Sequence, residues 1–161
     1  MQRSTPAQYL LILLDLAIGR GVPLAELLRD TSLSATTLDQ LGTRVAEEDF
    51  RTLSTNALRL TQDPELGLRL GERLNLSAHA VLGQAFLTCR DLREVIHLFE
   101  RYYRVVAQDL DLEFTWTEAT VSFRYQPLEL GPEGRFGAEC IAAAMRNTLS
   151  ALLGDDLGPI H

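Results

Sequence analysis

The sequence contains no lysine, so its 15 basic side chains are all arginine, and they are outnumbered by 22 aspartates and glutamates for a formal net charge of −7. Proteins bind nucleic acid without sequence preference mainly by neutralising phosphates with Lys and Arg. The acidic balance therefore argues against direct DNA binding by these residues. A length of 161 residues, 46% of them hydrophobic, predicts one domain with a sizeable core.

Cysteines and long apolar runs are also scarce. Cys89 and Cys140 belong to no CxxC pair and have no histidine at ligand spacing, which excludes a disulfide framework and argues against structural zinc. We expect both to be small buried apolar side chains. A bilayer span needs about 20 apolar residues, whereas the most apolar stretch, residues 9–18, is interrupted by Asp15. The sequence therefore predicts no membrane segment and a cytoplasmic location.

Signatures of catalysis and metal binding are missing as well. The chain has no glycine-rich phosphate loop, no nucleophile elbow and no HExxH motif. Its three histidines, His79, His97 and His161, are too widely separated to predict a metal site. We therefore expect a protein that is not an enzyme and that holds no metal or cofactor.

Helical periodicity is present over most of the chain. Apolar spacing, caps and Pro/Gly punctuation predict helices over residues 6–20, 23–29, 46–60, from 63–64 onwards, 80–88, 92–106 and 135–153. Thr5 is the expected N-cap of the first helix, and Gly21 the left-handed residue after its end. This helix has almost no polar face, which predicts burial within the domain or, as the alternative, a dimer contact through residues such as Leu13.

Small residues recur at helical spacing in two places. Gly67 and Gly71 stand four apart, so they either permit close approach of another backbone or are ordinary surface glycines. The last helix, 135–153, is rich in alanine and should let a neighbour pack closely; it should end at Gly154.

The period of the pattern changes to two between Leu110 and Tyr125. Two apolar series alternate with polar residues, on either side of Glu118-Ala119: Leu110, Leu112, Phe114 and Trp116, then Val121, Phe123 and Tyr125. We interpret them as an antiparallel hairpin with one buried face. The predicted fold class is therefore α+β, mainly helical, with a small antiparallel hairpin packed on helices.

The helix over 92–106 is the most clearly amphipathic segment. Asp91 and Glu94 have capping-box spacing at its start. A basic stripe, formed by Arg90, Arg93, His97, Arg101 and Arg104, lies opposite its apolar face. The stripe is either a solvated face or a docking surface for an acidic partner, for which Arg93, His97 and Arg101 are the interface candidates.

Aromatic residues concentrate in the middle of the chain, where this helix and the hairpin should meet. Such a set is either core or the wall of an apolar ligand pocket whose polar groups are Tyr hydroxyls and the Trp indole. The candidate ligand-binding residues are Phe86, Phe99, Tyr102, Tyr103 and Trp116.

Several segments together resemble one known family. The sequence is TQDPELGLRLG over 61–71, LGQA over 82–85, LREV over 92–95, RYYRVV over 101–106 and LLG over 152–154. In order and spacing these resemble the arabinose-binding-like N-terminal domain of AraC-type bacterial transcription regulators.

The resemblance implies that residues 1–161 are a single effector-sensing and oligomerisation domain, truncated before a DNA-binding helix-turn-helix domain. The implied partners are a small-molecule metabolite, a second copy of the chain and, only through the absent domain, DNA. We expect the metabolite to enter between the 92–106 helix and the hairpin. The alternative is a ligand-free dimerisation module.

Overall fold

The computed structural model describes residues 3–39, 42, 44–106, 111–118, 120–126 and 131–153. In chain order the elements are β1 (Ser4–Pro6), α1 (Ala7–Ile18), α2 (Leu24–Leu27), α3 (Ala35–Leu38), β2 (Arg44–Ala46), α4 (Glu47–Thr61), α5 (Leu66–Arg73), the 3-10 turn η1 (Leu76–His79), α6 (Ala80–Phe86), α7 (Leu92–Val106), β3 (Asp111–Trp116), β4 (Val121–Gln126) and α8 (Pro132–Leu153). The predicted fold class, mainly helical α+β, is confirmed. None of the helices within the described ranges has the length and apolarity needed to cross a bilayer.

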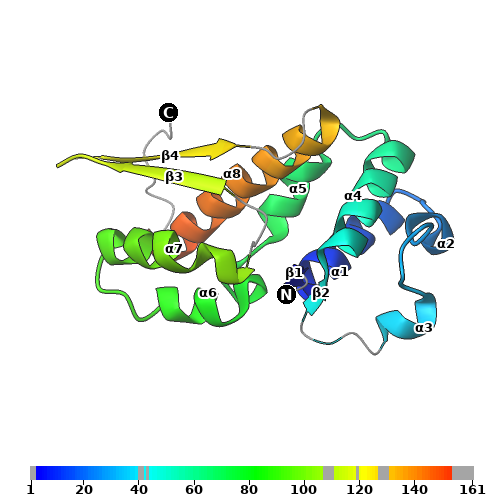
Figure 1. Ribbon diagram of the computed structural model, residues 1–161, viewed down its shortest axis with the longest axis horizontal. Coiled ribbons are helices and arrows are strands. Elements are labelled where there is room, and N and C mark those ends of the chain that lie inside the picture. Colours follow the sequence, from blue (N-terminus) through cyan, green and yellow to red (C-terminus); the bar gives the residue numbers. More distant parts are fainter. Residues whose placement is uncertain are drawn as a thin grey trace.

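The helices form two groups joined through the middle of the molecule. Figure 1 shows α1 to α4 at one end, α6, α7 and the β3–β4 hairpin at the other, and α5 and α8 between them. The main core lies mostly in the first group and α5, and its largest fully buried side chains are all leucines: Leu10, Leu13, Leu27, Leu53, Leu66, Leu70 and Leu74. A smaller cluster around Leu82, Phe86 and Val95 forms the core of the second group.

The contact between α5 and α8 depends on two glycines. A Cβ on Gly67 would lie 2.3 Å from the carbonyl oxygen of Phe136, and a Cβ on Gly71 would lie 2.3 Å from that of Cys140. Both distances are far below van der Waals contact, so only glycine lets the two backbones approach this closely. Of the two interpretations of this pair, close backbone approach is the one confirmed.

The start of the chain differs from the prediction. Thr5 does not cap α1; it lies in β1, which pairs antiparallel with β2, and its hydroxyl donates a hydrogen bond to the buried Glu47 carboxylate. Pro6 takes the cap position instead. The short β1–β2 sheet was not predicted, because three-residue strands that are 40 residues apart leave no periodicity to detect.

At other helix ends, local hydrogen bonds and backbone conformation decide where the helix begins or ends. Gly21 has the expected positive φ of 81°. α5 begins at Leu66 rather than at Pro64, because the Asp63 carboxylate accepts the Glu65 N–H at 2.9 Å and holds residues 63–65 in a turn. α3 was missed by the sequence analysis, although Ser34 and Thr37 form a complete capping box at its start.

The α7 helix and the hairpin match the predicted ranges closely. The Glu94 N–H donates to Asp91 Oδ1 at 2.9 Å, while the Glu94 carboxylate accepts the N–H of Arg90 rather than that of Asp91. In the hairpin Phe114 pairs with Phe123, and the Thr117 N–H donates to the Thr120 carbonyl at 2.9 Å across the expected turn. The remaining predicted positions, Leu110, Ala119, Gly154 and His161, lie outside the described residues.

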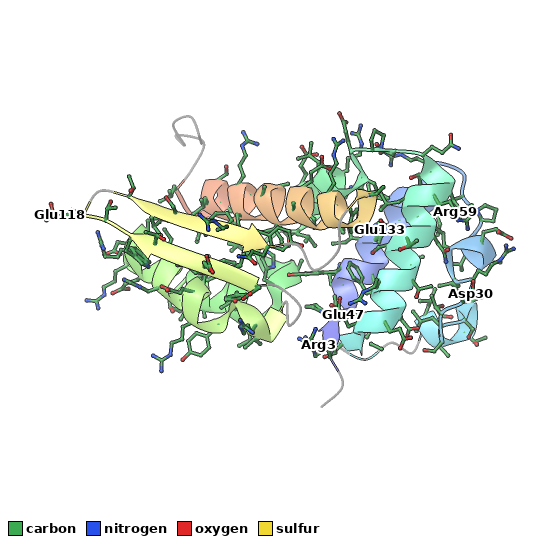
Figure 2. All side chains as sticks on the ribbon, turned by 45° about the horizontal axis from the view of Figure 1, so that its top comes forward. Arg3, Asp30, Glu47, Arg59, Glu118 and Glu133 are labelled. Carbon is green, nitrogen blue, oxygen red and sulfur yellow. The ribbon has the colours of Figure 1, made fainter. Side chains whose placement is uncertain are left out.

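The hairpin is only partly buried on its apolar face. Leu112 is buried and Phe114 is half-buried, but Phe123 on the second strand is exposed. β3 makes the ring contacts with α7, through Phe114 and Trp116, whereas Phe123 lies on β4. Figure 2 shows the hairpin extending toward Glu118 at its tip.

Replacing Gly67 with alanine tests the close contact between α5 and α8. The added methyl must displace the Phe136 backbone, so we expect Gly67→Ala to lower the free energy of unfolding by about 2 kcal/mol, net of the helix propensity that alanine gains. Urea denaturation measures the change.

Gly42→Ala is the matched control, because Gly42 is exposed and a Cβ there would meet nothing within 4 Å. It should change stability by less than about 0.5 kcal/mol. Equal, small effects of both substitutions would show that the two backbones are not held at this distance.

Candidate functional site

A partly open cavity of about 110 Å³ lies where α6, α7 and α8 meet the end of the main core. α6 contributes Leu82 and Phe86, spaced one helical turn apart. α7 contributes Val95, Ile96 and Phe99 from its apolar face. α8 contributes a longer row, which includes Ile141, Met145, Thr148 and Leu149. The side toward the main core is closed by Tyr9, Leu74 and His79.

Local packing places both α6 and η1 against this cavity. A Cβ on Gly83 would lie 1.7 Å from the Leu76 carbonyl oxygen, so only glycine allows α6 to fold back onto the preceding turn. That turn carries His79, which is buried at the base of α6. On α8 the cavity-lining row adjoins the residues that contact Gly67 and Gly71, and Cys140 and Ala144 belong to both sets, so α8 is shared between α5 and the cavity.

One buried polar network crosses the cavity wall. Tyr9 Oη lies 2.6 Å from His79 Nδ1, and Thr148 Oγ1 lies 3.4 Å from His79 Nε2. A neutral imidazole has one donor and one acceptor nitrogen, and each hydroxyl can take either role, so both ring nitrogens are satisfied. The network thereby connects α1, η1 and α8 through one side chain.

Burial keeps the ionisable groups of the wall uncharged. It lowers the pKa of His79 to about 4 and raises the pKa of the Cys140 thiol to about 12. The pKa of Tyr9 is raised as well, also chiefly by burial. At neutral pH the cavity therefore has no charged group among its lining residues. Cys140 and Cys89 are both half-buried, so the prediction that they are buried apolar side chains holds only in part.

The five predicted ligand-binding residues fall in three places. Phe86 and Phe99 line the cavity, with ring centroids 6.5 Å apart. Tyr103 is buried between α7 and the hairpin, where its hydroxyl accepts the Leu112 N–H. Tyr102 is exposed on the surface of α7.

Trp116 lies on the far side of α7 from the cavity-lining residues. Its ring stacks on His97 with centroids 4.1 Å apart, and its indole N–H donates to Glu100 at 3.1 Å. The hairpin instead packs on α7 through Phe114, which contacts both Phe99 and Tyr103. The described cavity lining contains no hairpin residue, whereas the sequence analysis expected the ligand between α7 and the hairpin.

The predicted interface residues lie in two different places, one in the core and the others on the surface of α7. Leu13 has no exposed surface and packs in the main core, so it offers no dimer contact, although Leu11 and Ile18 on the same helix are exposed. Arg93, His97 and Arg101 are exposed on α7. The guanidinium groups of Arg93 and Arg101 lie over the rings of Trp116 and Tyr102, respectively.

The residues that the sequence analysis missed are Tyr9, His79 and Thr148. They come from segments about 70 residues apart, and no local spacing connects them. The one available signal was a polar side chain on an otherwise apolar helix face, as with Thr148 in the alanine-rich α8.

A second hollow differs in chemistry. It lies between α4, the start of α8 and β4, and its lining includes Glu47, Arg51, Tyr125 and Glu133. Figure 2 shows Glu47 and Glu133 near the starts of their helices. We refer to it as the charged hollow, because a charged small molecule would find ionic partners there and not in the apolar cavity.

The low pKa of His79 makes stability depend on pH in a defined direction. Between its ordinary pKa of 6.5 and its folded value of about 4, the unfolded chain takes up a proton that the folded chain does not. The free energy of unfolding therefore falls as the pH drops through this window, by about 3 kcal/mol in total. Above the window His79 makes no contribution to the pH dependence. In His79→Gln this loss should be missing, so the stability gap between wild type and variant should shrink from pH 7 to pH 4.

Urea denaturation at several pH values measures this gap. His97→Gln is the matched control, because His97 is exposed, and it should keep the wild-type pH dependence. Parallel curves for wild type and His79→Gln would contradict a buried neutral imidazole.

Comparison with known proteins identifies the domain. Residues 21–160 match the family described as the arabinose-binding domain of AraC transcription regulator, N-term. The chain is 33% identical over 157 residues to the ornithine utilization regulator of Pseudomonas aeruginosa, covering 97% of this chain and 46% of that protein. It is 28% identical over 145 residues to uncharacterized HTH-type transcriptional regulators of Mycobacterium bovis and Mycobacterium tuberculosis, covering 88% of this chain and 42% of each. The chain thus spans about half the length of these relatives, and it belongs to the N-terminal arabinose-binding domain family of AraC transcription regulators.

Proposed function

We propose that this chain is the small-molecule-sensing domain of a longer DNA-binding transcription regulator, and that its effector occupies the apolar cavity between α6, α7 and α8. The observation that carries the proposal is that cavity, which is lined by side chains from both helical groups. Family membership supports the regulatory role, because the similar curated proteins are named as regulators. The DNA-binding part would lie in residues beyond this domain.

The position of the cavity suggests how occupancy could be transmitted. Leu74 belongs to the main core, Phe86 and Val95 belong to the smaller cluster, and all three line the cavity. A ligand shifts an equilibrium only by its differential affinity for the two states. A molecule that touches both clusters binds best when they are held in this arrangement, so it would favour that arrangement over any more open one.

A ligand-free dimerisation module is the second candidate. It is favoured by two exposed apolar side chains, Val81 on α6 and Leu87 directly after it, which are 67% and 64% exposed. The basic stripe of α7, with Arg93, His97 and Arg101, would be the polar part of such a contact. In either case we propose a homodimer as the working form of the regulator.

A substitution that fills the cavity distinguishes between the sensing domain and the dimerisation module. Met145 lines it from α8, and Met145→Trp should fill it, whereas Arg146→Trp places the same ring at an exposed position of the same helix. In a thermal-shift screen of common metabolites, at least one compound should stabilise wild type and Arg146→Trp but not Met145→Trp. A ligand at 100 times its Kd adds about 2.7 kcal/mol. L-ornithine belongs in the set, because a relative is named for its utilization.

Two results would count against sensing at this site. Compounds that stabilise all three proteins equally would place the site elsewhere, and a screen without any stabilising compound would favour the dimerisation module. Ile141→Phe, which fills the same cavity from a different position, repeats the test if Met145→Trp folds poorly.

A further inference from the structure

We infer that the effector of the apolar cavity is an uncharged, largely apolar molecule, the size of one aromatic ring or a short hydrocarbon chain, with room for a single hydroxyl or carbonyl group beside Thr148. This inference rests on the proposed function and specifies its ligand class. It would exclude free amino acids, carboxylates and amines as occupants of this cavity.

The lining supplies no ionic partner. Ten of its fourteen residues have hydrocarbon or thioether side chains, and the other four are Tyr9, His79, Cys140 and Thr148. Burial holds the first three of these in their neutral forms at neutral pH. Moving an ammonium or carboxylate group from water to such a wall is strongly unfavourable, because no partner there compensates for the lost hydration.

The polar side chains of the cavity wall are also largely hydrogen-bonded to one another. Both ring nitrogens of His79 are taken, one by the hydroxyl of Tyr9 and the other by that of Thr148. A threonine hydroxyl has one donor and two acceptor positions, so Thr148 keeps two of them after its bond to His79. One neutral polar group on the ligand can be satisfied by this single hydroxyl, whereas a charged group needs two or three partner groups.

The volume sets the size of the occupant. The cavity measures about 110 Å³. Engineered apolar cavities of about 150 Å³ bind benzene. The cavity of this domain is smaller but partly open, so one ring or a short chain occupies it with its polar group toward Thr148 and extends in part through the open side.

A series of probes that differ only in charge tests the inference. Benzyl alcohol, benzoate and the benzylammonium ion share one ring and one carbon branch. At pH 7 benzyl alcohol should raise the Tm of wild type and Arg146→Trp but not of Met145→Trp. Benzoate and benzylammonium should bind the cavity at least tenfold more weakly. Methyl NMR signals of Ile96, Ile141 and Met145 report occupancy of the cavity itself, and binding of the ions in the charged hollow would leave these signals unchanged.

Thr148→Val removes the hydroxyl at nearly constant volume. The substitution should weaken the binding of benzyl alcohol several-fold. It should leave the binding of toluene, which has no polar group, unchanged. Equal losses for both probes would contradict the role of Thr148.

The outcomes separate this inference from the proposed function. Benzoate or benzylammonium perturbing the cavity methyls as strongly as benzyl alcohol would overturn the ligand class but leave sensing at this site intact. If none of the probes and no metabolite of the screen perturbed these methyls, both would fail.

Discussion

The close backbone contact between α5 and α8 is the constraint on which the rest of the structure depends. Gly67 and Gly71 bring α8 so near to α5 that a single methyl group cannot be inserted. One side of α8 is thereby fixed against α5, and the adjoining row of its side chains lines the cavity together with residues of α6 and α7. Figure 1 shows α8, with α5, between the two helical groups. The apolar cavity is lined by side chains of α8 and of both groups.

That cavity has an energetic consequence. The cavity is partly open and its lining is apolar, so a molecule bound there would cover apolar surface, which is favourable by about 25 cal/mol per Å². The buried network of Tyr9, His79 and Thr148 leaves neither ring nitrogen of His79 unpaired in the cavity wall. A domain built in this way leaves stability to be recovered by whatever fills the cavity, which is the property that a ligand-dependent equilibrium requires.

Sequence patterns predicted the parts of the fold that depend on local periodicity. α7, the hairpin pairing and the left-handed Gly21 follow from spacing within a few residues. The β1–β2 pair and the contacts of His79 with Tyr9 and Thr148 could not be predicted, because they join segments 40 to 70 residues apart. The aromatic candidates show the same limit: helical spacing placed Phe99 on the inner face of α7, but only the packed hairpin decides that Trp116 lies on the outer one.

On the outer face of α7 the basic side chains are arginines that stack on aromatic rings, which lysine could not do in the same way. Arg93, Arg101 and Arg104 each lie over an aromatic ring, at 5.4 to 5.6 Å from the ring centroid. A planar guanidinium can stack on a ring in a way that an ammonium group cannot. Arg93 over Trp116 and the stacked His97 tie the basic stripe to β3, while Phe99 reaches from the cavity to Phe114 on the same strand. Any displacement of α7 that accompanies filling of the cavity therefore carries the stripe and the hairpin with it.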